Sequence, residues 1–429
     1  MSENSLALVS IRIGSKPSTF PNLELCRSQL SLLVIGLLIF ALGCKTESET
    51  AEQPDRSLIK IGYYGDLSGP TFNFGTSAKN GVLMAADEIN RLGGIKGRRI
   101  DVVIEDDHGS PERSAMLATK LIDKDEVVVV IAGGVSGASL AAAPRAQAHK
   151  IPFVSPSSTD LAVTRTGDYI FRVCFIDAFQ GEVMARFAIN TLKAKKTAIM
   201  VDFNNPYSRG LSEFFELSFT KLGGEIVTKQ SYAQGDPDFR GQLSAIRTLA
   251  PDAIYIPGYY GDVALIAKQA RQLGLEQPLL GGDGWDAPEL WQLGGDALNN
   301  SYITSHYSAG DPSPRIQQFV EQYKQLYGNL EPDAHAALAY DAMLVVADAI
   351  ERSGTTEAAK LRDALAQTKA FAGVTGRISF NDNRDAVKPA VVIKLQDGER
   401  IFQRTIEPEP EASPSPSPSP SPSPRRRRR

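Results

Sequence analysis

Short apolar runs alternate along most of this chain with longer segments in which apolar residues recur at helical spacing. The first cycle predicts strands at 58–64, 99–106 and 127–134. The helix expected after the first strand, over 77–94, has an apolar face formed by Val82, Ala85, Ala86 and Ile89. Alternation of this kind predicts a parallel sheet with helices covering both faces.

The same alternation begins again after 169–175 and continues to about residue 284. Two consecutive runs of one type predict two doubly wound lobes. The last part has helices at 314–328 and 337–354, followed by apolar strands. It could return to the first lobe and end on the second. The fold class expected is therefore α/β, with two Rossmann-like lobes joined by a multi-strand hinge.

An apolar run from Leu30 to Gly43 follows Arg27 and ends directly before Cys44. The run is short for a membrane span and typical of the apolar region of a secretory signal. Ala41 and Gly43 ahead of the cysteine resemble the lipobox of bacterial lipoproteins, although a branched residue is usual at 41 and a small one at 42. We predict a signal peptide with lipobox over 1–44, lipidation of Cys44 and a tether over 45–57. A simple secretory signal or an uncleaved anchor is the alternative.

The end of the chain differs in composition from the part before it. Residues 413–424 are Ser-Pro repeats, and five arginines follow them. Such a sequence cannot build a core, so residues 406–429 are predicted to form a disordered tail.

Composition narrows the classes of function. The chain is 42% apolar with a formal net charge of −4, which is ordinary for a globular protein and argues against a nucleic-acid surface. Of the three cysteines, only Cys174 lies outside the predicted signal, so no internal disulfide is expected. The four histidines, at 108, 149, 306 and 335, show no metal-binding spacing. Phosphate-binding loops and a GxSxG elbow are also missing, and we expect no metal, no cofactor and no catalytic site. The acids at 105–107 beside His108 are interpreted as a solvated loop.

Two polar loops at strand ends carry the first candidate site. Ser136 is expected to be the N-cap of a helix that runs to residue 149, so that its hydroxyl and the first-turn amides could meet a small anion. The loop from Ser155 to Thr159 follows the next strand and offers four hydroxyls. In open α/β sheets ligands bind at such carboxyl ends. The alternative is that these serines only cap and turn.

Aromatic residues and one acid complete the constellation. Rings are expected in loops at strand ends, namely Phe72, Phe74, Tyr207, Tyr259 and Tyr260. They line a cleft or, alternatively, only cap the core. Asp283 stands between glycines after an apolar strand, so its carboxylate could meet a cation. Anion donors on one lobe and an acid on the other describe a site for a zwitterion, such as a small amino acid.

From about Leu58 to Gln403 the chain resembles the leucine/isoleucine/valine-type substrate-binding proteins of ABC importers, the branched-chain amino-acid class. The motifs that carry the resemblance, in order, are GDLSGP, FGTSAKNGVLMAADEIN, GGIKGRRI, DYIFRVCFID, FQGE, YSRGL, PDAIYIPGYY, IAKQARQLG and LLGGDGWD. The resemblance implies a type I periplasmic binding protein fold with three chain crossings. It places lobe 1 at 58–177 and 305–386, and lobe 2 at 178–304 and 387–405.

The same resemblance implies roles for individual residues. The ligand carboxylate would meet Ser136 and Thr159, with a main-chain contact at Ser157. The ammonium would meet Asp283, where the family usually has Glu. The rings that would close over the ligand are Phe74, Tyr207 and Tyr259.

The function implied is capture of an amino acid outside the cytoplasm, by a membrane-anchored lipoprotein in the periplasm or at the cell surface, and delivery to ABC permease subunits. One alternative is a sensor of the same fold for an amino acid, an amide or urea. A second is a nucleotide-dependent enzyme built on the Rossmann-like halves, against which the missing phosphate loops and the export signal count.

Overall fold

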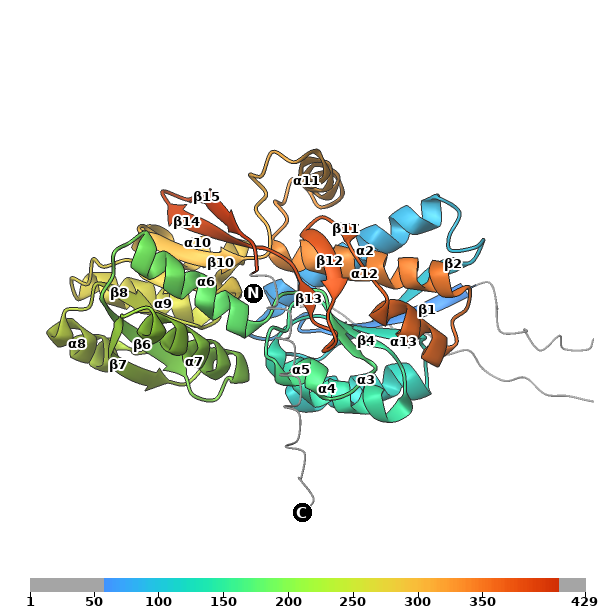
Figure 1. Ribbon diagram of the computed structural model, residues 1–429, viewed down its shortest axis with the longest axis horizontal. Helices are drawn as coiled ribbons and strands as arrows, with labels where there is room; N and C mark the ends of the chain where they lie inside the picture. The colour runs from blue at the N-terminus through green and yellow to red at the C-terminus, as the bar shows by residue number, and fades with distance from the viewer. Residues whose placement is uncertain (1–57, 409–429) are drawn as a thin grey trace, which may run out of the picture. The chain divides into compact units, whose positions relative to one another are not determined.

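The computed structural model describes residues 58–408. The predicted signal peptide, Cys44 and the tether lie outside the described residues, as does the predicted tail from residue 409 onwards. The start of the predicted tail at 406 is wrong by one residue, because Ile406 is the last residue of a strand and pairs with Ala390. The described part is a mixed α/β structure built on two large sheets, which confirms the predicted class (Figure 1). No helix within 58–408 has the length and apolar character that crossing a membrane requires.

The first sheet is parallel throughout and has the strand order β2-β1-β3-β4-β5. Its strands are β1 Leu58–Gly65, β2 Arg99–Asp106, β3 Val129–Ala132, β4 Phe153–Ser155 and β5 Ile170–Arg172. The helices that connect these strands are α2 Phe72–Arg91, α3 Pro111–Asp123, α4 Ser136–His149 and α5 Ala162–Arg165. The strand order reverses between β1 and β3, so the loops after these strands flank a switch point where ligands bind in such sheets.

The second sheet has the order β15-β14-β10-β9-β8-β6-β7, and only β14 and β15 are antiparallel to their neighbours. Its strands are β6 Lys196–Asp202, β7 Glu225–Tyr232, β8 Ala253–Tyr255, β9 Leu279–Gly281, β10 Ser301–Ser305, β14 Ala390–Gln396 and β15 Glu399–Ile406. The helices of this part are α6 Asp177–Asn190, α7 Pro206–Lys221, α8 Arg240–Leu249, α9 Tyr260–Gln272 and α10 Pro288–Gly294, with 3-10 turns η1 Asp283–Trp285 and η2 Gly295–Leu298. Its switch point lies between β6 and β8, so the loops after those strands flank it.

A third group of elements packs with the first sheet around one hydrophobic core, and the two together are called the first lobe below. It contains α11 Pro314–Leu326, α12 Ala334–Ser353 and α13 Ala358–Ala366, followed by the small sheet β11 Phe371–Gly373, β12 Gly376–Phe380 and β13 Ala386–Val387. Helix α12 packs along α2, and buried residues of both helices share one hydrophobic core with β1 and β3. The chain passes three times between the part built on the first sheet and the part built on the second sheet, at 173–176, 306–313 and 388–389.

Local chemistry sets the helix starts that matter for the site. Asn205 caps α7 by accepting a hydrogen bond from Tyr207 N, and Pro206 occupies the first turn. Asp333 caps α12 by accepting from Ala336 N. These caps fix the position of Tyr207 in the first turn of α7 and the position of the first turn of α12.

Candidate functional site

Six of the seven predicted binding residues line a single cavity. It is small, about 10 Å³, and is bounded by Phe74, Gly134, Val135, Ser136, Ser157, Tyr207, Tyr259, Asp283, Gly284 and His335. Space of this size holds about one water molecule. The walls come from the parts built on both large sheets. Helix α2 and the loops after β3 and β4 belong to the first part, and they face α7, α9 and η1 of the second. The polar loops that were predicted at the carboxyl ends of separate strands therefore border the same cavity.

The two serine loops are bonded to each other. Strands β3 and β4 are parallel neighbours, with Val130 opposite Phe153, so the loops that follow them start side by side. Ser157 Oγ donates to Gly134 O over 2.9 Å, and Ser158 Oγ donates to the same carbonyl over 3.0 Å. These bonds hold both loops in one surface of the cavity.

The expectation that Ser136 is an N-cap is wrong by one position. The cap is Val135, in an extended conformation, and Ser136 is the first residue of α4. Its Oγ accepts from Asp160 N over 3.4 Å, in the second loop, instead of capping its own helix. Ser136 therefore still lies at a helix N-terminus that borders the cavity, and its side chain joins the two loops.

Thr159 is the one predicted binding residue outside the cavity lining. Its side chain is fully buried, and Thr159 Oγ1 makes no well-formed hydrogen bond within the described chain, although it interacts with the carboxyl group of Asp177. Buried hydroxyls without a well-formed hydrogen bond are rare in folded proteins and call for an explanation. Thr159 O accepts from Asp177 N over 3.0 Å, which links this loop to the start of α6.

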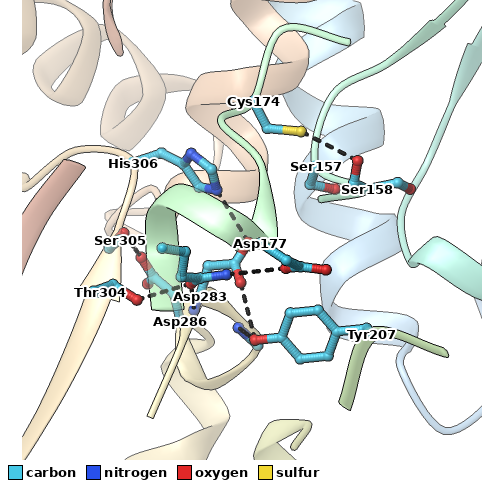
Figure 2. A network of polar contacts seen from close by, with 12 residues as sticks. Ser157, Ser158, Cys174, Asp177, Tyr207, Asp283, Asp286, Thr304, Ser305 and His306 are labelled. Carbon is cyan, nitrogen blue, oxygen red and sulfur yellow. Dashed lines mark hydrogen bonds and ion pairs between the residues drawn. The ribbon is translucent and has the colours of Figure 1, made fainter. Parts of the chain in front are cut away.

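Asp283 is buried and its carboxylate has two donors (Figure 2). Tyr207 Oη donates to Oδ1 over 2.9 Å, and His306 Nε2 lies 3.0 Å from Oδ2. The two side chains approach the carboxylate from opposite sides. The expected unshielded carboxylate is thus a shielded one, held by two other side chains.

The flanking glycines have a steric reason. A Cβ on Gly282 would lie 2.5 Å from Tyr207 Oη, and one on Gly284 would lie 2.6 Å from Gly258 O. Any larger residue would block the approach of Tyr207 to Asp283. Gln180 fixes the same turn, because its Oε1 accepts from Asp283 N and from Thr304 Oγ1, each over 2.8 Å.

Protonation states follow from burial and these bonds. Burial alone would raise the pKa of Asp283, but the hydrogen bond from His306 holds it below its ordinary value. Burial lowers the pKa of His306, and Asp283 offsets only part of that change. At neutral pH we therefore assign an ionised Asp283 beside a neutral His306 whose proton is on Nε2. Asp177 differs, because burial raises its pKa well above the usual range.

Three of the aromatic rings predicted for the site line the cavity. The rings of Tyr207 and Tyr259 are stacked with centroids 5.3 Å apart, and Phe74 meets Tyr259 edge to face at 5.8 Å. Phe72 differs from the expectation, since it is 45% exposed and does not line the cavity. Both phenylalanines lie in the first turn of α2 and not in a loop.

Two histidines were missed by the sequence analysis. His306 follows β10 directly and stacks on Phe175 with ring centroids 3.7 Å apart. His335 lies in the first turn of α12, stacks on Phe74 at 3.9 Å and lines the cavity. The position of His306 at a strand end is a signal that could have identified it.

A cluster of carboxylates lies elsewhere in the first lobe. Oxygens of Asp66, Asp106 and Asp107 come close together, the arrangement that a cation site would need. Each carboxylate already accepts hydrogen bonds: Asp66 from Thr71 N, Asp106 from Leu67 N and Asp107 from Gly109 N, for example. These bonds explain the cluster as a device that shapes the loops after β1 and β2.

Comparisons with known proteins agree on one family. A family model described as periplasmic binding protein matches residues 58–400. The Leu/Ile/Val-binding protein homolog 3 of Brucella melitensis is 28% identical over 344 residues, which are 80% of this chain and 92% of that protein.

Two solved structures are similar over most of the chain. The leucine-binding protein LivK of Thermotoga maritima is 40% identical with a TM-score of 0.78, covering 82% of this chain and 99% of that one. The branched-chain amino acid transporter substrate-binding protein LivJ of Streptococcus pneumoniae, solved in complex with isoleucine, is 34% identical with a TM-score of 0.78. The match covers 82% of this chain and all of that one.

Proposed function

Because this chain belongs to the leucine/isoleucine/valine-type class of the periplasmic binding protein family, we propose that it captures one α-amino acid between its lobes. It then delivers the amino acid to the membrane subunits of an ABC importer. Its work is a difference in ligand affinity between open and closed states and includes no bond-making step.

One observation carries this proposal: groups for both charges of an amino acid face one cavity. On one side lie Ser136 at the N-terminus of α4 and Ser157 in the neighbouring loop. A helix N-terminus favours an anion such as the ligand carboxylate. On the other side lies the ionised Asp283, which has two donors and retains acceptor capacity for an ammonium group.

The predicted hydroxyl of Thr159 supports the same assignment. Its Oγ1 is buried, makes no well-formed hydrogen bond within the described chain and interacts with the carboxyl group of Asp177, so a ligand carboxylate that reached it would receive a hydrogen bond. We propose Phe74, Ser136, Ser157, Thr159, Tyr207, Tyr259 and Asp283 as the ligand-binding residues.

Entry of a ligand requires the lobes to separate. A cavity of about 10 Å³ does not hold an amino acid, so the geometry corresponds to a closed arrangement. The predicted lobe boundaries, at 177/178, 304/305 and 386/387, lie next to the three connections between the sheets. We propose that these connections act as the hinge.

Membership of this family implies a location outside the cytoplasm. We further propose that the signal over 1–44 is cleaved and that Cys44 carries the lipid anchor. The site itself is consistent with the sensor alternative, because transport and sensing would use the same closure.

A thermal-shift panel tests the proposal. The purified protein is melted with each of the twenty amino acids, urea, short amides and a set of nucleotides. A ligand at 100 times its Kd stabilises a protein by about 2.7 kcal/mol, which is visible as a raised Tm. The proposal predicts that one chemical group of α-amino acids raises the Tm. A shift by nucleotides alone, or by no compound, contradicts it.

A further inference from the structure

His335 lines the ligand cavity, and one of its ring nitrogens is unpaired within the described chain. The residue lies in the first turn of α12 and is 5% exposed. Its ring stacks on Phe74, with an interplanar angle of 14°, and both rings line the cavity. Among the described residues, Nδ1 of His335 has no hydrogen-bond partner. A buried ring nitrogen of this kind is costly unless a ligand supplies the missing bond.

The polar groups on the other walls of the cavity face the charged ends of the proposed ligand. Ser136 and Ser157 face the carboxylate of the proposed ligand, and Asp283 with Tyr207 faces its ammonium. The remaining side chains are Phe74, Val135, Tyr259 and His335. Neither charged end of the proposed ligand uses His335, so this polar group is available to the side chain of the ligand.

The imidazole is neutral when it meets the ligand. Burial lowers the pKa of His335 to about 3, against the smaller opposing effect of Asp283. A neutral imidazole has one donor and one acceptor but no charge. A charged ligand side chain would stay unpaired beside it, whereas a hydroxyl or an amide can donate or accept and so suits either tautomer.

We propose that His335 makes this site selective for α-amino acids with an uncharged hydrogen-bonding side chain, such as serine, threonine, asparagine and glutamine. The inference rests on the proposed function, since it uses the orientation given by the two charged ends. This selectivity differs from that of a wholly apolar wall, which would favour apolar side chains. A site built to hydrogen-bond a ligand group rejects the analogue without that group more strongly than an apolar site rejects an added hydroxyl.

Two pairs of ligands with similar shape test the selectivity. Threonine and valine differ by a hydroxyl in place of a methyl, and asparagine and leucine by an amide in place of an isopropyl group. Isothermal titration calorimetry of the purified protein gives a Kd for each. We expect threonine and asparagine to bind at least about tenfold more tightly than their apolar counterparts.

Three variants assign the effect to the ring nitrogen. His335→Phe keeps the stack on Phe74 and removes both nitrogens, so the preference should fall to about equal affinity or reverse. His335→Gln keeps a donor and an acceptor and should retain part of the preference. His149→Phe, at the exposed end of α4, is the control and should leave every Kd unchanged. Melting curves confirm that each variant folds.

The outcomes separate the two claims. A wild-type protein that binds valine and leucine as tightly as their polar partners, with His335→Phe unchanged, overturns the role of His335 and leaves amino-acid binding intact. Binding of no α-amino acid overturns the proposed function and this inference together.

Discussion

At the scale of single residues, the candidate site depends on how Asp283 is held. Its carboxylate accepts from Tyr207 and His306, both buried, so its orientation is fixed before a ligand arrives. A preorganised charge avoids the cost of ordering it during binding. The same arrangement places a titratable ring directly beside the proposed ammonium position.

Ligand affinity should therefore fall when His306 gains a second proton. An imidazolium would pair with Asp283 and repel the ligand ammonium, so the ligand and the extra proton exclude each other. Because burial lowers the pKa of His306 below its ordinary value of 6.5, affinity should be constant at pH 7 and above, and should weaken as the pH decreases toward the lowered pKa of His306. Calorimetric titrations between pH 7.5 and 5 measure this dependence.

His306→Gln is the matched control for that titration. Glutamine can still donate to Asp283 but does not titrate, so its profile should be flatter than that of the wild-type protein. The other titratable groups that act on His306 or Asp283 include Tyr207, His335, Lys388 and Asp177, which stay in both proteins. Identical slopes in the two proteins would show that His306 is not the responsible group.

Asp283 and Tyr207 were both predicted from the sequence, but their contact and the position of His306 beside Asp283 were not. Asp283 follows an apolar strand and stands between glycines, and both signals are local. The contact with His306 joins residues 23 positions apart through the ends of β9 and β10, and the contact with Tyr207 spans 76 positions. Such pairs depend on strand order in the sheet, which a single sequence does not specify. His335 was missed for the same reason, because only the packing of α12 on α2 brings it to Phe74.

At the scale of elements, the α2–α12 pair positions one side of the cavity. Phe74 comes from the first turn of α2 and His335 from the first turn of α12, so their stack depends on how closely the two helices approach. Gly81 allows that approach, since a Cβ there would lie 2.1 Å from Ala336 O, a backbone atom. The periodicity of each helix was predictable, but this contact between backbones was not.

Gly81→Ala should destabilise the protein by about 1–3 kcal/mol, because the helix backbones must move apart. The free energy of unfolding from urea titrations measures the effect. Gly241→Ala is the control, because Gly241 lies in α8 and its added Cβ would meet no atom within 4 Å. That change should be neutral or stabilise by up to about 1 kcal/mol. Equal effects of the two substitutions would refute the close-packing account.

At the scale of the whole described molecule, two large sheets are joined by three connections. The predicted family and type I fold are confirmed by the matching family model and by the solved structures LivK and LivJ. The alternation of strands and helices predicted the α/β class with two doubly wound lobes, whereas the family and the type I fold were implied by the resemblance of nine sequence motifs. The lobe boundaries and the role of each ligand-binding residue stay predictions.

We expect the proposed closure to involve contacts outside the ligand cavity as well. Tyr260 Oη, at the start of α9, donates to Pro70 O over 3.2 Å and accepts from Asn73 Nδ2 over 3.1 Å, across the cleft. Tyr260→Phe removes both bonds without touching the cavity lining. Ligand affinity should decrease about two- to tenfold, mainly through faster dissociation.

Stopped-flow dissociation rates and calorimetry measure that change. Tyr327→Phe is the control, because Tyr327 Oη donates to Asn80 O within the first lobe. It should leave both the rate and the affinity unchanged. A Tyr260→Phe protein with wild-type kinetics would exclude this contact from closure.

The most direct test of the zwitterion site is a binding cycle on Asp283. The Kd of the tightest-binding amino acid is measured with the wild-type protein and with Asp283→Asn, and again for the analogue of that ligand without its amino group. We expect the substitution to weaken binding of the amino acid by about 2–5 kcal/mol, because a buried ammonium loses its partner, and to have little effect on binding of the analogue. An equal loss for both ligands, or no loss for either, would contradict the pairing of Asp283 with the ligand ammonium.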